Sequence, residues 1–526
     1  MAEHTSYQAQ AQLLASKLWS IANDLRGNMD ASKFKNYILG TIFYRYLSER
    51  TEQCMQEVLE IDKQTYEEAF NSSPQRRAEV QDWSLQELGY IIEPKYLFRT
   101  LVQKIQTPRS DADKFSIEDF ENAIKALTDS TQGQESESAF EGLFNDLRLQ
   151  DPELGDTVAE RTALIGKVIS QISELEFDLT DPKLDILGTA YMILIGLFAS
   201  DAGKKSGEFF TPTGPAQLVA TLATVGLSEA KTVGDCTCGS ASMLLEVQKH
   251  LSAHKVGHFY GQEKNASTYN LARMNMLMHG VSYQDFSIYK GDTITQDLYG
   301  DLKLTVQVCN PPYSLKYDPK ISGLKEDPRY RDAGQLPPQK YADLLFLEHM
   351  IWHMDEKDGR IAVLLPHGVL FRDKAEAAIR KRIIQQLNCL DAVIGLPENL
   401  FHNTPIAVCL LVLKANRGDN RDNILFIDAS QEFVKAGNKN SLEQAHINKI
   451  VEAYTKRVDV DHFARVVPRD EIVANDFNLN IPRYIEAEKV DDTVDLEAVR
   501  EELSNIAANK QAAVNKVESM LAQLGL

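Results

Sequence analysis

The stretch Leu-Thr-Val-Gln-Val-Cys-Asn-Pro-Pro-Tyr at residues 304–313 decides the fold class of this chain. Its apolar, β-branched first half predicts a buried strand, and Asn310-Pro311-Pro312-Tyr313 predicts a turn at the strand's end. The turn gathers a carboxamide, proline carbonyls and an aromatic ring. Such a set suits a planar exocyclic amine, because two acceptors take its hydrogens while a ring stacks on its π-system. Adenine N6 in nucleic acid and the side-chain amide of glutamine are both such groups, and an ordinary strand-ending turn is the bland alternative.

Around this turn, short apolar runs alternate with helical stretches from about residue 185 to about residue 430. The runs that we expect to be strands are 232–234, 258–261, 305–308, 360–365, 390–395 and 406–413. This alternation predicts an α/β fold with a mostly parallel sheet. Ligands of such folds bind at the carboxyl ends of the strands, which is where the Asn310 turn is expected.

The sequence predicts three domains. Residues 1–165 show apolar residues at helical spacing and predict a helical accessory or docking domain, and residues 166–475 hold the alternating pattern of a catalytic domain. Residues 476–526 form a tail, in which a heptad pattern from Leu496 onward is interrupted only by Lys510. The pattern predicts a helix with a narrow apolar stripe, packed on its own chain or on another subunit.

Composition limits the possible functions. The 526 residues carry a formal net charge of −20, so the chain lacks the basic balance of a protein that holds DNA unaided. The six cysteines have neither disulfide-framework nor metal-ligand spacing, which favours reduced thiols, a cytoplasmic location and no metal. No signal peptide is evident, and the longest apolar run, 186–200, is too short to span a membrane and predicts a buried helix.

Three carboxylates at expected strand ends precede the turn. Asp235 opens the small-residue segment Asp-Cys-Thr-Cys-Gly-Ser-Ala-Ser at 235–242, whose backbone N–H groups a ligand can approach closely. Glu263 follows roughly twenty residues later, the interval expected of an acid that binds ribose hydroxyls, and Asp292 precedes the strand that ends at Asn310. Each acid alone is more simply a solvated surface group, but the ordered series favours a nucleotide-like cofactor.

The segment 314–340 follows the turn directly and combines Pro and Gly with basic residues and tyrosines. Basic and aromatic residues in alternation suit contact with a nucleic-acid strand. A solvated loop is the equally weighted alternative, because the segment also carries four acidic residues.

Together these residues resemble the modification (M, HsdM-type) subunit of type I restriction-modification systems, an S-adenosylmethionine-dependent adenine-N6 DNA methyltransferase. The Asn310 turn is similar to its catalytic motif, 235–242 to its main cofactor loop, and 207–212 to the segment before that loop. Residues 18–30, 365–371 and 476–480 are similar to further family signatures, so the resemblance covers nearly the whole chain. It implies a Rossmann-like methyltransferase sheet, an N-terminal helical domain, a C-terminal helical tail and the activity numbered EC 2.1.1.72.

The resemblance also implies residue roles. Tyr313 stacks on a flipped adenine, while the Asn310 side chain and the Pro311 carbonyl accept the N6 hydrogens, with Pro312 completing the motif. Glu263 holds the ribose of S-adenosylmethionine and Asp292 its adenine. The remaining implied cofactor contacts are Glu208, Phe209, Phe210, Thr211, Pro212, Asp235, Gly239, Ser240, Ser242 and Asn310 itself.

Two positions depart from the family pattern. Cys236 stands where Pro is more usual, and Ala241 stands where Gly is more usual. The methyl group at Ala241 narrows the approach of a ligand slightly, and we expect binding to survive. The stretch 402–405 lacks the glycines often seen there and is given no role.

The resemblance implies partners that explain the acidic balance. A separate specificity (S) subunit reads the DNA sequence, usually with two M subunits per S, and a restriction (R) subunit joins the full complex. The helical domain and the tail are the candidates for this docking. The alternatives are a glutamine-N5 protein methyltransferase, a non-catalytic scaffold, and a self-sufficient adenine methyltransferase, against which no recognition domain follows the turn.

Overall fold

The computed structural model of the chain describes residues 2–24, 31–175, 186–201, 210–251, 255–401, 404–437 and 439–486, together with positions 500, 503, 504, 510, 511 and 515. The chain divides into two units, Met1–Ile485 and Glu486–Leu526. Apart from isolated positions, the predicted heptad helix of the tail lies outside the described residues. Glu208 and Phe209 lie outside them as well.

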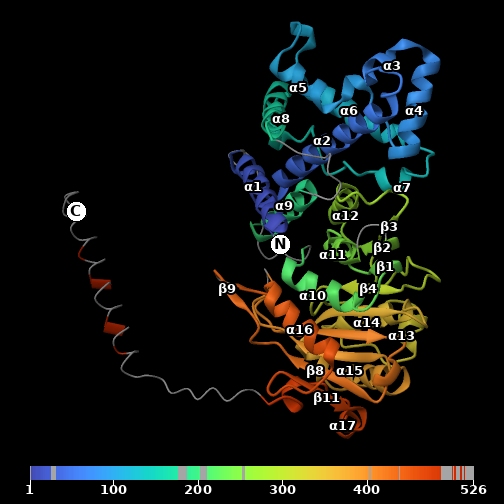
Figure 1. Cartoon of the computed structure of the whole chain (residues 1–526), viewed down its shortest axis with the longest axis vertical. Coiled ribbons are helices and arrows are strands. Elements are labelled where there is room, and N and C mark those ends of the chain that lie inside the picture. The colour runs from blue at the N-terminus through green and yellow to red at the C-terminus, as the bar shows by residue number, and fades with distance from the viewer. Residues whose placement is uncertain are drawn as a thin grey trace. The chain divides into compact units, whose positions relative to one another are not determined.

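The N-terminal region is helical, as predicted (Figure 1). Its helices are α1 Ala2–Asp24, α2 Ala31–Leu59, α3 Tyr66–Ser72, α4 Pro74–Leu88, α5 Phe98–Gln106, α6 Ile117–Ser130, α7 Glu137–Phe140, α8 Val158–Ser173 and α9 Ile186–Asp201. Helices α3, α6 and α8 begin with capping boxes. In each, a Thr or Ser side chain accepts a backbone N–H of the first turn, and an acidic side chain of that turn accepts the backbone N–H of the Thr or Ser. Helix α9 is the apolar run 186–200, and its Leu187, Tyr191 and Leu194 are buried as expected.

The following region is a nine-stranded sheet in the order β11-β8-β6-β7-β5-β4-β1-β2-β3. The strands are β1 Ala230–Asp235, β2 Val256–Glu263, β3 Phe286–Lys290, β4 Val306–Cys309, β5 Arg360–Pro366, β6 Leu390–Gly395, β7 Val408–Lys414, β8 Asn423–Asp428 and β11 Ala464–Pro468, and β9 Val434–Ala436 with β10 Lys439–Ser441 forms a separate hairpin. All six expected strands are present. The ladder β3-β2-β1-β4-β5 is parallel, whereas β7 runs antiparallel between β5 and β6.

Helices cover both faces of this sheet (Figure 1). They are α10 Thr213–Thr224, α11 Ser242–Leu251, α12 Ala266–Met278, α13 Pro328–Arg331, α14 Asp343–Trp352, α15 Ala375–Lys381, α16 Gln444–Lys456 and α17 Arg469–Ala474. Strand β5 shows why two layers are needed. Ala362 and Leu364 join the core that contains α10, α11 and α12, while Val363 and Leu365 join the core that contains α14 and α15. A strand buried on both faces reads as a continuous apolar run, which is what the sequence shows there.

Helix α12 connects the sheet with the helical region. The buried Arg273 donates from Nη1 to the carbonyls of Ser138 and Glu141, both at 2.9 Å. From the other side, the Tyr46 hydroxyl donates to the carbonyl of Leu277 at 3.0 Å. The boundaries 1–165, 166–475 and 476–526 stay a prediction. Within the described residues, every helix is too short or too polar to cross a bilayer.

Candidate active site

The site lies where the connections of the sheet diverge. Strands β1 and β4 are parallel neighbours, and β2 and β5 lie on opposite sides of that pair. In open α/β sheets such a switch point opens a crevice at the carboxyl ends of the strands. Asp235 ends β1, Glu263 ends β2, and Asn310 follows β4, so the topology brings these predicted residues to one edge.

The Asn310 carboxamide is oriented by two neighbours. Its Nδ2 donates to Thr211 Oγ1 at 3.0 Å, which turns Oδ1 to the opposite side. The Tyr313 hydroxyl donates to that Oδ1 at 2.6 Å. An amide oxygen has two lone pairs, so Oδ1 keeps acceptor capacity for one more donor. Thr211, one of the predicted cofactor residues, therefore contacts the Asn310 turn directly.

Two residues at this turn were missed by the sequence analysis. The ring of Phe401 meets that of Tyr313 edge to face, with centroids 5.8 Å apart and planes at 89°. The fully buried Asp343 accepts the Ser314 backbone N–H at 2.7 Å, and Ser314 has a left-handed φ of 52°. Asp343 thus fixes the backbone that leaves the turn. Phe401 directly precedes the stretch given no role, and its aromatic side chain was the only local signal.

The small-residue turn after β1 is held by Glu263. Gly239, at φ 54°, donates its N–H to Glu263 Oε2 at 3.1 Å, and Asn265 donates its N–H to Oε1 at 2.7 Å. The Oγ of the buried Ser240 has no hydrogen-bond partner among the described residues, and buried Ser242 begins α11.

Asp235 is a buried carboxylate at the end of β1. Only 2% of it is exposed, and burial raises its pKa to about 7, although the Thr237 backbone N–H donates to Oδ1 at 3.0 Å. Among the described residues, its hydrogen bonds and ion pairs include no Lys, Arg or His. A buried carboxylate of this kind favours a cationic ligand, because a nearby positive charge restores ionisation.

The two departures from the family pattern have local explanations. Ala241 has φ 63° and is fully buried, so a left-handed position that suits Gly carries a Cβ here. Cys236 is also buried, and its Sγ lies 3.6 Å from that of Cys309, the last residue of β4. The Cys236 side chain therefore contacts the end of β4, in the core that contains α14 and α15.

The other predicted cofactor residues border the same edge. Asp292 accepts the Ile294 N–H at 3.0 Å and pairs with the exposed Lys264 at 2.8 Å. Phe210 is half-buried against α9, where a Cβ added at Gly196 would come 3.0 Å from its ring. Pro212 caps the start of α10.

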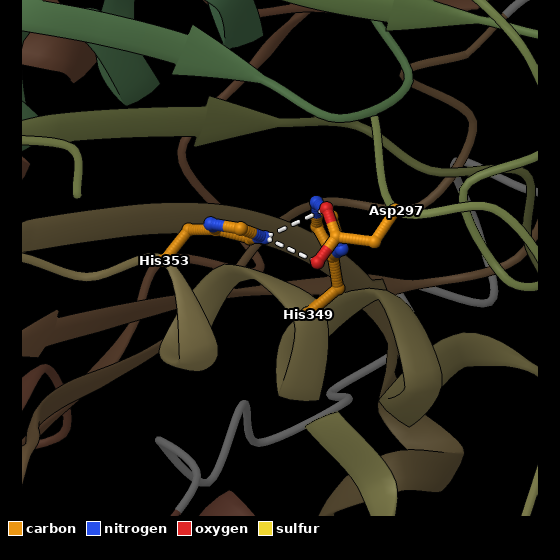
Figure 2. A group of neighbouring side chains, drawn as sticks. All are labelled: Asp297, His349 and His353. Carbon is orange, nitrogen blue, oxygen red and sulfur yellow. Dashed lines mark hydrogen bonds and ion pairs between the residues drawn. The ribbon is translucent and has the colours of Figure 1, made fainter. Parts of the chain in front are cut away.

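The side chains of Asp297, His349 and His353 form a cluster (Figure 2). His353 donates from Nδ1 to the Leu302 carbonyl at 2.8 Å and from Nε2 to Asp297, at 3.1 and 3.2 Å from its oxygens. His349 Nδ1 instead accepts from Arg329 at 3.0 Å, which leaves its proton on Nε2. Metal-bound histidines donate their second N–H to an acceptor, and the Arg329 contact has the opposite polarity. These hydrogen bonds favour a structural cluster over a metal centre.

A Rossmann-like sheet with a small-residue turn after its first strand and Asn-Pro-Pro-Tyr after its fourth defines a methyltransferase class of α/β protein. The family model described as N-6 DNA Methylase matches residues 182–493, and the HsdM N-terminal domain matches residues 14–172. The chain belongs to the N-6 DNA methylase family. The predicted membership among type I modification subunits, with its adenine-specific DNA methyltransferase class, is confirmed.

Relatives match over most of the chain. The type I restriction enzyme MpnII methylase subunit of Mycoplasma pneumoniae is 34% identical over 519 residues, covering 96% of this chain and 95% of the relative. The MjaVIII methylase subunit of Methanocaldococcus jannaschii is 32% identical over 404 residues, covering 74% of this chain and 67% of the relative. The crystal structure of a type I methyltransferase subunit from Streptococcus thermophilus has a TM-score of 0.82 and 36% identity, covering 90% of this chain and all of that one.

Proposed function

We propose that this chain transfers a methyl group from S-adenosylmethionine to N6 of an adenine flipped out of DNA, acting in the cytoplasm within a type I complex. The observation that carries the proposal is the orientation of Asn310 at the end of β4. Its Nδ2 is fixed on Thr211, so Oδ1 is presented as an acceptor beside Tyr313. An amine with two hydrogens to donate fits this arrangement.

The cofactor half of the edge fits S-adenosylmethionine. Asp235 supplies a buried carboxylate for its ammonium group, and the Glu263 carboxylate, which orders the Gly239 turn, would accept from the ribose hydroxyls. Asp292 would hold the adenine of the cofactor, and Ser240 and Ser242 line the small-residue turn after β1. When bound, the cofactor supplies an electrophilic methyl group on a sulfonium. The implied contacts of Phe210 and Pro212, and of Glu208 and Phe209 outside the described residues, belong to the same proposal.

The catalytic turn acts on the target base by positioning it. Asn310 Oδ1 and the Pro311 carbonyl accept the two N6 hydrogens, which draws the nitrogen lone pair out of conjugation with the ring. Tyr313 stacks on the base, and Phe401 supports Tyr313 from its edge. Unstacking the adenine costs on the order of a few kcal/mol. Most of the rate enhancement then comes from holding nucleophile and methyl donor close and in line.

The net charge of −20 fits a subunit that obtains much of its DNA affinity from others. The relatives above are named as methylase subunits of restriction enzymes. By analogy, an S subunit reads the target sequence with two copies of this chain, and an R subunit joins the full complex. The helical region and the tail are the proposed docking parts.

The test is transfer of a labelled methyl group to unmethylated DNA by this chain with a co-expressed S subunit. Asn310→Ala should abolish labelling of adenine N6, while Asn448→Ala, on the exposed face of α16, should leave it unchanged. Labelling by the chain alone would instead make it self-sufficient. Cofactor binding without DNA labelling in the complex would contradict the proposal and point to a protein glutamine.

A further inference from the structure

Arg329 is a buried arginine whose donors are all used. It lies in α13, within the segment 314–340, which we name the post-turn loop because it follows the Asn310 turn. Its Nε and Nη2 grip the Asp327 carboxylate at 3.0 and 2.6 Å, and Nη2 also donates to the Ile294 carbonyl at 3.2 Å. Its Nη1 donates to the Thr293 carbonyl at 2.6 Å and to His349 Nδ1 at 3.0 Å. A guanidinium has five N–H groups, so none is left for an outside ligand.

The tyrosines of the post-turn loop point inward as well. The buried Tyr330 donates its hydroxyl to the Ile294 carbonyl at 3.2 Å, and the buried Tyr317 donates its own to Pro337. These rings are therefore unavailable to stack on a nucleic-acid strand, which corrects the sequence-based interpretation for them and for Arg329. In contrast, the lysines of the loop, Lys316, Lys320, Lys325 and Lys340, are exposed.

The backbone that Arg329 holds is the segment that directly follows Asp292. Asp292 Oδ1 accepts the Ile294 N–H, and Thr293 Oγ1 donates to the Cys236 carbonyl at 2.5 Å. One chain of hydrogen bonds thus runs from the cofactor turn through 292–294 to the post-turn loop. His349 accepts the Arg329 hydrogen bond. Its ring lies next to the Asp297–His353 pair (Figure 2). The segment that is to bind the cofactor adenine and the loop next to the target base share one buried guanidinium.

We propose that Arg329 is a positioning residue that couples cofactor binding to closure of the post-turn loop. The inference rests on the proposed function of Asp292. When Asp292 binds the adenine of the cofactor, the backbone of residues 292–294 is restrained. Arg329 and Tyr330 reach the carbonyls of Thr293 and Ile294 only when the loop is closed. Restraining these carbonyls therefore favours the closed loop. Coupling is reciprocal, so loop closure strengthens cofactor binding by the factor with which the cofactor closes the loop.

The experiment is limited digestion of the full-length chain by endoproteinase Lys-C, with and without S-adenosylmethionine, beside a measurement of the cofactor Kd. The exposed lysines of the loop report its opening, since cleavage follows the open population when opening is fast. In the wild-type chain the cofactor should slow cleavage in the loop by roughly 5- to 150-fold, the usual range of such coupling. Arg329→Ala should bring that ratio to about one and raise the Kd by the same factor.

Matched variants separate coupling from general destabilisation. Arg331→Ala removes an exposed neighbour in α13, whose ion pair among the described residues is with Asp332 at 3.4 Å, and it should change neither quantity. Tyr330→Phe removes a single hydrogen bond and should lower the protection ratio about 2- to 13-fold, though not below one, so it tests the coupling even if Arg329→Ala does not fold. Neither Arg variant changes a Lys-C site.

The outcomes are distinct. Cofactor binding by the wild-type chain without protection of the loop overturns the coupling and leaves the proposed function standing. Protection that survives in Tyr330→Phe and Arg329→Ala at the wild-type ratio also overturns it. A wild-type chain that binds no S-adenosylmethionine overturns both the coupling and the proposed function.

Discussion

Asp235→Asn tests whether a buried carboxylate waits for a cation at the end of β1. Burial raises the Asp235 pKa from an ordinary 3.8 to about 7. A pKa raised by about three corresponds to about 4 kcal/mol in favour of the protonated carboxyl group. The folded chain holds this proton more tightly than the unfolded chain, so the wild type loses stability as the pH rises from about 4 to about 7. The carboxamide that replaces the carboxyl group in the variant has no proton to lose in this range.

The assay is urea unfolding of the ligand-free chain between pH 5 and pH 8. The free energy of unfolding of Asp235→Asn, relative to wild type, should grow by about 1.4 kcal/mol per pH unit up to pH 7 and then level off. All other titrating groups are common to both chains and cancel in the difference. Asp301→Asn, which changes an exposed carboxylate, is the matched control.

Cofactor binding should respond in the opposite direction. The ionised Asp235 attracts an ammonium group, so the wild-type affinity for S-adenosylmethionine should fall up to about tenfold per pH unit below about pH 7. The variant should bind roughly 10- to 150-fold more weakly above pH 7, with less dependence on pH. A variant with wild-type affinity, or a stability difference that does not change with pH, would refute the reasoning.

Three further substitutions test the surroundings of the turn. Thr211→Val removes the acceptor of Asn310 Nδ2 at constant shape and should lower kcat about 5- to 150-fold, with a smaller change in cofactor Kd, in steady-state methylation assays of the complex. Phe401→Ala removes the edge-to-face contact with Tyr313 and should lower kcat/KM for DNA about 2- to 13-fold. An unchanged kcat/KM would exclude a role of Phe401 in supporting the Tyr313 ring. Ala241→Gly relieves roughly 1–2 kcal/mol of left-handed backbone strain, but it loses a buried methyl group and raises the entropy of the unfolded chain. Because these effects oppose each other, the free energy of unfolding in urea should change by less than about 1 kcal/mol. A loss of several kcal/mol would contradict this.

The positions of Asp235, Glu263 and Asn310 were predictable because the local sequence marks where a strand ends. An apolar run followed by Asp235, Glu263 or Asn310 marks the carboxyl end of a strand, and parallel strands bring such ends to one edge. The strand at 406–413 was also predictable, but its antiparallel direction was not. Direction depends on how β7 inserts between β5 and β6, which no local periodicity records.

The residues that orient the turn could not be found in the same way. Asp343 acts through the Ser314 backbone, and Phe401 through the Tyr313 ring, across long stretches of chain. Arg329 was misjudged for a related reason. A basic residue in a Pro- and Gly-rich segment suggests a charge that faces solvent. Arg329 is buried because it donates to the carbonyls of Thr293 and Ile294, and no local sequence pattern predicts these contacts.

The strand order has a consequence for how the polypeptide folds as it is synthesised. Val233 of β1 pairs with Val306 of β4, and Val363 of β5 pairs with Leu411 of β7. Pairings between segments this distant are slow to form, because loop closure precedes the contacts that reward it. The helical region, rich in local contacts, can fold while the later strands are still on the ribosome. Until β4 emerges, β1 exposes an unpaired edge, so nascent chains truncated before Asn310 should be the aggregation-prone species.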